Sequence, residues 1–359
     1  MLPRVSRTFA LNIRLLNGSM GEAVRIGYLL CRIADTIEDA WPGDRDEVES
    51  RFDEFLAALV GDDTEARSLA SAAPRLRGFA SAAHVELVSH APEVLRAFAT
   101  LEHEDRETVA EAVTTLATGM RRYAGRAAER RTVRRAQRPA ASGDTPARVP
   151  AFAYLDDDAE LSDYCWVVAG CVGVMLTRLF ERRQQDGGQR DGGHDEERTA
   201  LSPVVGEALQ LTNILLDWPT DVRAGRCHVP ASWLTEAGLE PGDLVGAARP
   251  EVAALASRLE ARARASLARV PDYLATLPAR HVRYRMFCLW PSLWAAASLR
   301  NAMRDPAFPW GEARPRLAKS ELWSAAASAL ARGHSTAGVA ALFTACGAPP
   351  APRPLPPGG

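Results

Sequence analysis

Three carboxylates lie within five residues of one another in the stretch CRIADTIEDA, residues 31 to 40. Asp35, Glu38 and Asp39 are spaced i, i+3 and i+4, so in a helix they share one face, where like charges repel by about 0.2–0.5 kcal/mol per pair. The alternative is a solvated acidic helix end, but the apolar residues upstream argue against it. A positively charged group is therefore expected opposite this face.

A second group of polar side chains lies in the stretch ALQLTNILLDWPTD. Gln210, Asn213 and Asp217 follow an i, i+3, i+7 pattern, and Asp221 comes four residues later. A continuous helix would place all four on one face, either at a binding site or as a polar stripe satisfied by neighbouring helices. Pro219 lacks an N–H and is expected to kink or end the helix just before it, which leaves the direction of Asp221 open.

Together the two clusters indicate a cation site. Two acidic patches on separate apolar helices are costly to bring into one core unless cations lie between them. Mg²⁺ prefers oxygen ligands and is commonly held by one or two carboxylates together with substrate phosphates. The sequence has no HExxH, no clustered Cys and His, no P-loop and no GxGxxG after a strand, so zinc, nucleoside triphosphate and Rossmann sites lack their signatures. We predict a magnesium site for a diphosphate ester.

Arginines near the clusters are suited to the diphosphate. Arg32 lies three residues before Asp35, Arg7 follows Ser6 in VSRTFA, and Arg226 lies in DVRAGRCHVP. Guanidinium groups can pair bidentately with phosphate oxygens. For each arginine the alternative is an ordinary surface ion pair.

Helical periodicity runs through almost the whole chain, which is rich in Ala, Leu, Arg and Glu, and alternating β-branched stretches are hard to find. We predict an all-α fold. The predicted helices span residues 19 to 40, 45 to 60, 92 to 127, 159 to 184, 198 to 218, 231 to 237, 249 to 276, 278 to 303 and 318 to 332.

Two apolar stretches could form the interior. DYCWVVAGCVGVMLTRLF combines Tyr164 with small residues, which allow helices to pack closely or leave room for a long apolar ligand. Trp290 and Trp294 lie four residues apart, either in the core or along an apolar tunnel. In a tunnel, their aromatic faces could stabilise a carbocation.

Composition narrows the function classes. The chain has 359 residues, is 47% hydrophobic and carries a formal charge of −2, so it lacks the basic field of a protein whose main partner is nucleic acid. The six cysteines form no CxxC pair and are expected to pack as small hydrophobes. The N-terminus does not read as a signal peptide, and the longest uncharged apolar stretch, CLWPSLWAAASL, is expected to be too short to cross a bilayer. We expect a cytoplasmic protein with no transmembrane segment.

Polar and Pro/Gly-rich stretches interrupt the helical pattern. They predict flexible loops near 128–158 and 183–198 and a disordered proline-rich tail at 347–359. The remainder, residues 1–346, is predicted to form one helical domain.

The motifs resemble those of the squalene and phytoene synthase family, and look closest to squalene synthase. The resemblance covers most of the chain, through VSRTFALNIRLL, CRIADTIEDA, YCWVVAGCVGVMLTRLF, LQLTNILLDWPTDVRAGRCHVP and FCLWPSLWAA. It implies a single-domain helical bundle of the isoprenoid synthase type around a deep apolar cavity, with both acidic motifs near its mouth.

The resemblance also implies a role for each motif residue. The implied magnesium ligands are Asp35, Glu38, Asp39, Asp217 and Asp221. The residues implied to bind diphosphate or line the mouth are Ser6, Arg7, Arg32, Gln210, Asn213 and Arg226. Tyr164 would assist proton removal. The implied reaction is head-to-head condensation of two farnesyl diphosphates to presqualene diphosphate and squalene, the last step using NADPH.

Three positions depart from the family pattern. Leu216 replaces a basic residue usual before Asp217, Val167 replaces a frequent aromatic residue, and His228 begins a pair that is usually aromatic and apolar. They leave two other reactions open, prenyl transfer to a small aromatic acceptor and phytoene-type condensation of two geranylgeranyl diphosphates. A non-catalytic scaffold is a further alternative, and a lipid product would make peripheral membrane contact expected.

Overall fold

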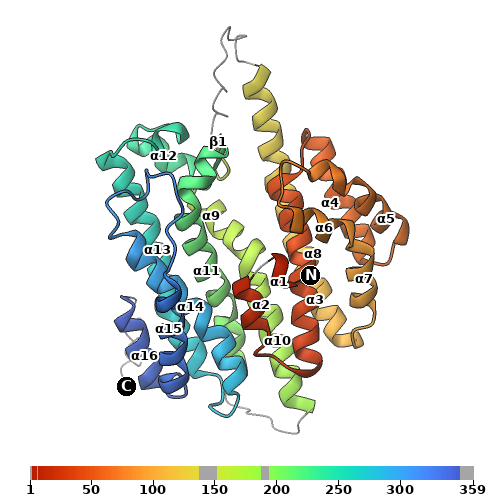
Figure 1. Ribbon diagram of the computed structural model, residues 1–359, viewed down its shortest axis with the longest axis vertical. Coiled ribbons are helices and arrows are strands. Elements are labelled where there is room, and N and C mark those ends of the chain that lie inside the picture. Colours follow the sequence, from red (N-terminus) through yellow and green to blue (C-terminus); the bar gives the residue numbers. More distant parts are fainter. Residues whose placement is uncertain (1, 6, 137–151, 187–193, 348–359) are drawn as a thin grey trace, which may run out of the picture.

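The computed structural model describes residues 2–5, 7–136, 152–186 and 194–347. Helices dominate it, and the long ones run roughly along the longest axis of the molecule (Figure 1). Within the described ranges, the two short strands β1 (Phe152–Ala153) and β2 (Arg226–Cys227) pair in parallel. The predicted all-α fold is confirmed.

The first half of the described chain holds α1 Leu2–Val5, α2 Arg7–Ile13, α3 Gly18–Ala40, α4 Arg45–Leu59, α5 Asp63–Ala72, the 3-10 helix η1 Ala73–Leu76, α6 Ala82–Ser89, α7 Ala91–Ala99 and α8 His103–Ala136. The second half holds α9 Asp158–Cys165, the π-helix η2 Trp166–Gly170, α10 Cys171–Asp186, α11 Asp195–Arg223, α12 Ala231–Ala237, the 3-10 helix η3 Pro241–Leu244, α13 Pro250–Ala275, α14 Val282–Ala302, α15 Lys319–Arg332 and α16 Thr336–Ala345.

The helix predicted at 92–127 is in fact two helices. The chain breaks after α7, where the Thr100 hydroxyl donates to the Ala97 carbonyl and Leu101 turns into the core. α8 then continues to Ala136, so the loop predicted from 128 begins too early. Arg130 is part of this helix and donates to the Ala153 carbonyl at 2.5 Å. Residues 137–151, 187–193 and 348–359, where the other loops and the tail were predicted, lie outside the described residues.

Pro219 does not end α11, so of the two effects predicted for it, a kink or a helix end, the helix end is wrong. The helix continues to Arg223, with Trp218 and Pro219 both buried. The indole Nε1 of Trp218 donates to the Leu244 carbonyl at 3.1 Å, and Arg223 donates to the Pro219 carbonyl at 2.6 Å. Tertiary contacts thus hold the helix through the proline, and Asp217 and Asp221 stay one turn apart.

Small residues let α10 and α11 approach closely. A Cβ added at Gly173 would overlap the Ser202 carbonyl of α11, and one at Gly206 would overlap the Ala169 carbonyl of η2. These glycines therefore serve helix packing. All six cysteines are free.

By length and composition, the stretch Asp158–Gln184 could cross a membrane, contrary to the prediction that no segment is long and apolar enough. Of its apolar window, 56% is buried inside the bundle. Burial of this kind is what a core helix of a helical bundle also shows.

Candidate active site

Arg226 joins the two acidic helices. Its Nη2 lies 2.8 Å from Oδ1 of Asp221 on α11, and its Nη1 lies 3.7 Å from Oδ1 of Asp39 on α3. The same Nη1 donates to the Asp39 backbone carbonyl at 3.2 Å. The positive group expected opposite the first cluster is therefore present, and it brings the C-terminal ends of α3 and α11 together.

A turn and a short strand pair position Arg226. α11 ends at Arg223, and Gly225 adopts a φ of +87°, which glycine tolerates and which lets the chain turn out of the helix. The chain then enters β2, where Arg226 is paired with Phe152 of β1.

Each helix carries a carboxyl group that is costly to ionise. Burial raises the pKa of Asp35 to about 6, although Arg32 Nη1 lies 2.8 Å from its Oδ2. Burial likewise raises the pKa of Asp217 to about 6, against the opposing charge of Arg314. Both groups would be stabilised as anions by additional positive charge.

Glu38 faces the interior, towards Tyr164. Its side chain is buried, and Tyr164 Oη donates to Oε1 of Glu38 at 3.4 Å. Burial raises the pKa of both groups well above the usual values. This position pairs Glu38 with a phenol, whereas Asp35 and Asp39 line a polar pocket.

The other predicted residues are less closely involved. Gln210 is half-buried on α11, and Asn213 is exposed there. Ser6 lies outside the described residues. Arg7 is the first residue of α2, but its side chain also lies outside them.

Sequence reasoning missed Arg314, which follows α14. Its Nη1 lies 2.9 Å from Oδ1 of Asp217, and its Nη2 donates to Oδ1 of Asn213 at 3.2 Å. Leu216, where a basic residue was expected, is only 3% exposed and packs in the core. Arg314 thus supplies positive charge beside Asp217, from a segment whose proximity no local spacing could indicate.

His228, noted as a departure, is also part of the site. Its ring centroid lies 4.9 Å from that of Tyr154 and 5.4 Å from that of Tyr164. Its Nδ1 lies 3.6 Å from Oδ2 of Asp221, and burial lowers its pKa. The imidazole therefore forms an aromatic wall with the two tyrosines next to the second acidic cluster.

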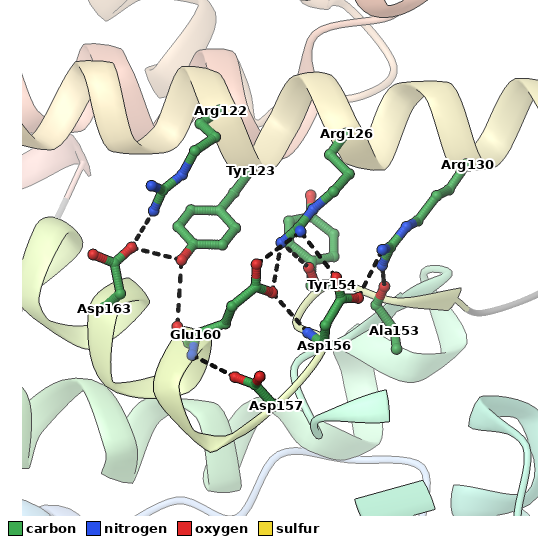
Figure 2. A network of polar contacts seen from close by, with 10 residues as sticks. All are labelled: Arg122, Tyr123, Arg126, Arg130, Ala153, Tyr154, Asp156, Asp157, Glu160 and Asp163. Atoms are coloured by element: carbon green, nitrogen blue, oxygen red, sulfur yellow. Dashed lines mark hydrogen bonds and ion pairs between the residues drawn. The ribbon is translucent and has the colours of Figure 1, made fainter. Parts of the chain in front are cut away.

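A row of arginines on α8 holds this wall in place (Figure 2). Arg126 pairs with both carboxylate oxygens of Glu160 at 2.8 Å and donates to the Tyr154 carbonyl at 3.1 Å. Tyr123 Oη donates to Oδ2 of Asp163 at 2.7 Å, and its ring meets that of Tyr164 edge-on at 5.1 Å. Arg126 and Tyr123 of α8 thus contact the two site tyrosines, Tyr154 and Tyr164.

A pocket of about 200 Å³ opens where the acidic cluster of α3 meets Arg226. Arg32, Asp35 and Asp39 line it from α3, Phe79 and Ser81 line it from the segment before α6, and His84 lines it from α6 itself. Its volume is below the 300–1,000 Å³ usual for drug-sized ligands, so it suits a small anionic group and not a long hydrocarbon.

The residues present fit Mg²⁺. The donors are hard carboxylate oxygens on two facing helices, and burial makes their unneutralised charge costly. Among the described residues, no three acidic, His or Cys side chains converge as a ready-made metal cage. Mg²⁺ is commonly completed by substrate phosphates, so this arrangement matches a metal shared with a diphosphate.

The chain belongs to the squalene/phytoene synthase family, whose model matches residues 2–321. The resemblance inferred from the motifs is thereby confirmed. The family acts on prenyl diphosphate substrates.

Individual relatives agree with this assignment. The chain is 32% identical to a 15-cis-phytoene synthase of Pantoea ananas over 158 residues, 44% of this chain and 43% of that protein. It is 28% identical to human squalene synthase over 306 residues, 83% of this chain and 61% of that protein. The matched region thus spans less than two thirds of the length of these curated relatives.

Solved structures with low sequence identity share the fold. The squalene synthase TcSQS, in complex with the ligand E5700, superposes with a TM-score of 0.73 at 20% identity, covering 96% of this chain and 87% of that one. A dehydrosqualene synthase superposes with a TM-score of 0.55 at 19% identity, covering 91% and 92%.

Proposed function

We propose that this protein condenses two farnesyl diphosphates head to head to presqualene diphosphate, and then forms squalene with hydride from NADPH. The observation that carries the proposal is the meeting of α3 and α11 at Arg226, beside a pocket of diphosphate size. The alignment with human squalene synthase extends over 83% of the chain at 28% identity, and that with the phytoene synthase of Pantoea ananas over 44% at 32% identity. We base the squalene-type product on the longer alignment and on the motifs, and the product analysis below decides between the two reactions.

The pocket residues would bind the departing diphosphate. Arg32 and Arg226 line the pocket, and each guanidinium has more N–H donors than its carboxylate contacts use. The residues that would hold Mg²⁺ are Asp35, Asp39, Asp217 and Asp221. When bound, Mg²⁺ would neutralise charge on the diphosphate oxygens and so make the group a better leaving group.

The first bond to break joins C1 of one prenyl chain to the diphosphate oxygen, which keeps the electron pair. Arg32 and Arg226 would stabilise the charge that develops on that oxygen. The double bond of the second prenyl chain then attacks the allylic cation, and loss of a proton from C1 closes the cyclopropane ring.

Tyr164 is the side chain best placed to assist the proton loss. It is 4% exposed, and its hydroxyl already faces a carboxylate, Glu38, at 3.4 Å. A proton taken by the phenol oxygen would be balanced by transfer of the phenol proton to Glu38. This assignment uses Glu38 as a proton acceptor and leaves the four aspartates for Mg²⁺.

The test is incubation with Mg²⁺ and farnesyl diphosphate, with pyrophosphate release as the first measurement. Mass spectrometry of the lipid extract, with and without NADPH, is the second. We expect presqualene diphosphate without NADPH and a thirty-carbon hydrocarbon with it. Release of pyrophosphate from neither farnesyl nor geranylgeranyl diphosphate would contradict the proposal.

Two other outcomes would indicate a different reaction from the one proposed. A forty-carbon product from geranylgeranyl diphosphate alone would indicate phytoene-type condensation, the reaction named for the phytoene synthases among its relatives. Turnover that appears only when an aromatic acceptor is added would indicate transfer to a second kind of substrate, in the part of the site that contains His228.

A further inference from the structure

Arg32 is held from two sides. Its Nη1 donates to Oδ2 of Asp35 at 2.8 Å on its own helix, and its Nη2 lies 2.9 Å from Nε2 of His84 on α6. A guanidinium has donors only, so Nε2 of His84 must be the acceptor and the imidazole proton must be on Nδ1. The contact therefore requires a neutral ring of one tautomer, and it joins residues 52 positions apart.

α6 holds His84 in a fixed position. The Ser81 hydroxyl caps the helix by accepting from the His84 backbone N–H at 3.3 Å. Leu87 and Val88, three and four residues after His84 and so on its face of the helix, are fully buried. Glu86 accepts two hydrogen bonds from Arg4, each 2.7 Å long, which tie α6 to α1.

Without an acceptor at Nη2, the Arg32 guanidinium would be free to rotate. An arginine beside a carboxylate favours a bidentate pair in which both carboxylate oxygens are engaged. That rotation would turn the guanidinium away from the pocket and neutralise Asp35. The contact to His84 opposes it, because Nη2 is engaged elsewhere and Asp35 is contacted through Oδ2.

We infer that His84 is a positioning residue, which holds the Arg32 guanidinium in the orientation that binds the diphosphate of the prenyl substrate. The inference rests on the proposed function for the identity of the anion. His84 and Arg32 line the same pocket of about 200 Å³, so the contact lies at its wall. His84 lies outside all of the sequence motifs that resemble those of the family.

The first test compares His84→Ala with His84→Gln. Alanine removes the acceptor, whereas the Gln Oε1 can take the place of Nε2 and accept from Nη2. We expect His84→Ala to raise KM for farnesyl diphosphate about tenfold and to change kcat less than about threefold. The reason is that a misoriented Arg32 would lose a charge-assisted hydrogen bond to the diphosphate. His84→Gln should restore KM to within about threefold of wild type.

Two further variants control for folding. His84→Asn has a shorter amide that should not reach Nη2, so it should behave as His84→Ala does. His90→Ala removes an exposed histidine at the end of α6, whose ring contacts the Glu86 carbonyl of its own helix, and should leave KM unchanged. Equal KM values for wild type, His84→Ala and His84→Asn would overturn the inference.

A binding measurement separates this inference from the proposed reaction. Calorimetric titration of inorganic pyrophosphate with Mg²⁺ present should show about tenfold weaker binding to His84→Ala, even if no prenyl donor is turned over. In Arg32→Ala the further change His84→Ala should add little, because His84 acts through Arg32. Full additivity of the two losses would overturn the positioning role.

Discussion

At the residue scale, the ionised form of Asp217 lowers the stability of the folded protein. Its pKa is raised from 3.8 to about 6 by burial, so the folded state binds a proton more tightly than the unfolded state does. Stability from this group is therefore present at low pH and is lost as the pH rises through about 6. An uncharged amide of the same shape avoids that loss.

We accordingly expect Asp217→Asn to keep or raise the melting temperature at pH 8 without Mg²⁺, and to gain less at pH 5, where the wild-type carboxyl is mostly protonated. The same variant should lose turnover about 100-fold if Asp217 binds the metal. Thermal melts at both pH values and pyrophosphate release check the two statements. A folded variant with wild-type turnover would remove Asp217 from the site.

Leu216 departs from the family sequence pattern, but this departure does not mean that the site lacks a positive charge. From the sequence, an arginine at this position is the obvious way to recover the basic residue usual in the family. The side chain is only 3% exposed, however, and Arg314 already pairs with Asp217. An added guanidinium would therefore be buried in the core without a partner.

Leu216→Arg should lower the free energy of unfolding by about 3 kcal/mol or more and should not improve use of a second prenyl diphosphate. Chemical denaturation and product analysis test this. Wild-type stability together with a lower KM would mean that residue 216 can reach the site.

At the scale of elements, side chains of α8 bind both β1 and α9 and hold them in place. Arg126→Ala removes a bidentate pair with Glu160 and a hydrogen bond to the Tyr154 carbonyl, in a partly buried setting. We expect a loss of about 2 kcal/mol in stability and a lower kcat, because both site tyrosines lose support. As a matched control, Arg96→Ala removes an exposed pair with Glu93 and should change stability by less than about 0.5 kcal/mol.

The helices with strong apolar periodicity could be predicted from the sequence, and α3, α4, α12, α13, α14 and α15 lie close to their predicted ranges. α5, α6 and α16 were not predicted, although Asp62, Ser81 and Ser335 cap their N-termini. Two other errors arose where tertiary contacts outweigh local preference. Pro219 is carried inside α11 by buried neighbours, and the break before α8 depends on Leu101 entering the core. Neither effect leaves a mark in local spacing.

At the scale of the whole molecule, the site is assembled from distant segments. Asp35 and Asp217 could be predicted because each belongs to a cluster with helical spacing. His84 and Arg314 could not, because each meets its partner through the packing of the bundle, across 52 positions for His84 and Arg32 and 101 for Arg314 and Asn213. Sequence patterns thus predict the acidic residues together with Arg32 and Arg226, and they miss the side chains that reach these residues from distant segments.

The same architecture predicts that metal and diphosphate bind together. Since no three candidate ligands converge among the described residues, Mg²⁺ alone should raise the melting temperature little. Mg²⁺ with pyrophosphate at 100 times Kd should stabilise the fold by about 2.7 kcal/mol, or roughly 3–5 °C. Scanning fluorimetry of wild type and Asp217→Asn tests this, and the variant should show a smaller shift. A full shift with Mg²⁺ alone would mean that the metal cage is preformed.

The positive side of the pocket consists of guanidinium groups, and the sequence contains a single lysine, Lys319, at the start of α15. Burial acts to lower the pKa of Arg226, but the surrounding carboxylates raise it above its usual value. Amine-directed reagents should therefore spare catalysis, whereas arginine-directed dicarbonyls should abolish it and bound pyrophosphate should protect. In alkaline solution these counter-charges should persist until the bundle itself unfolds.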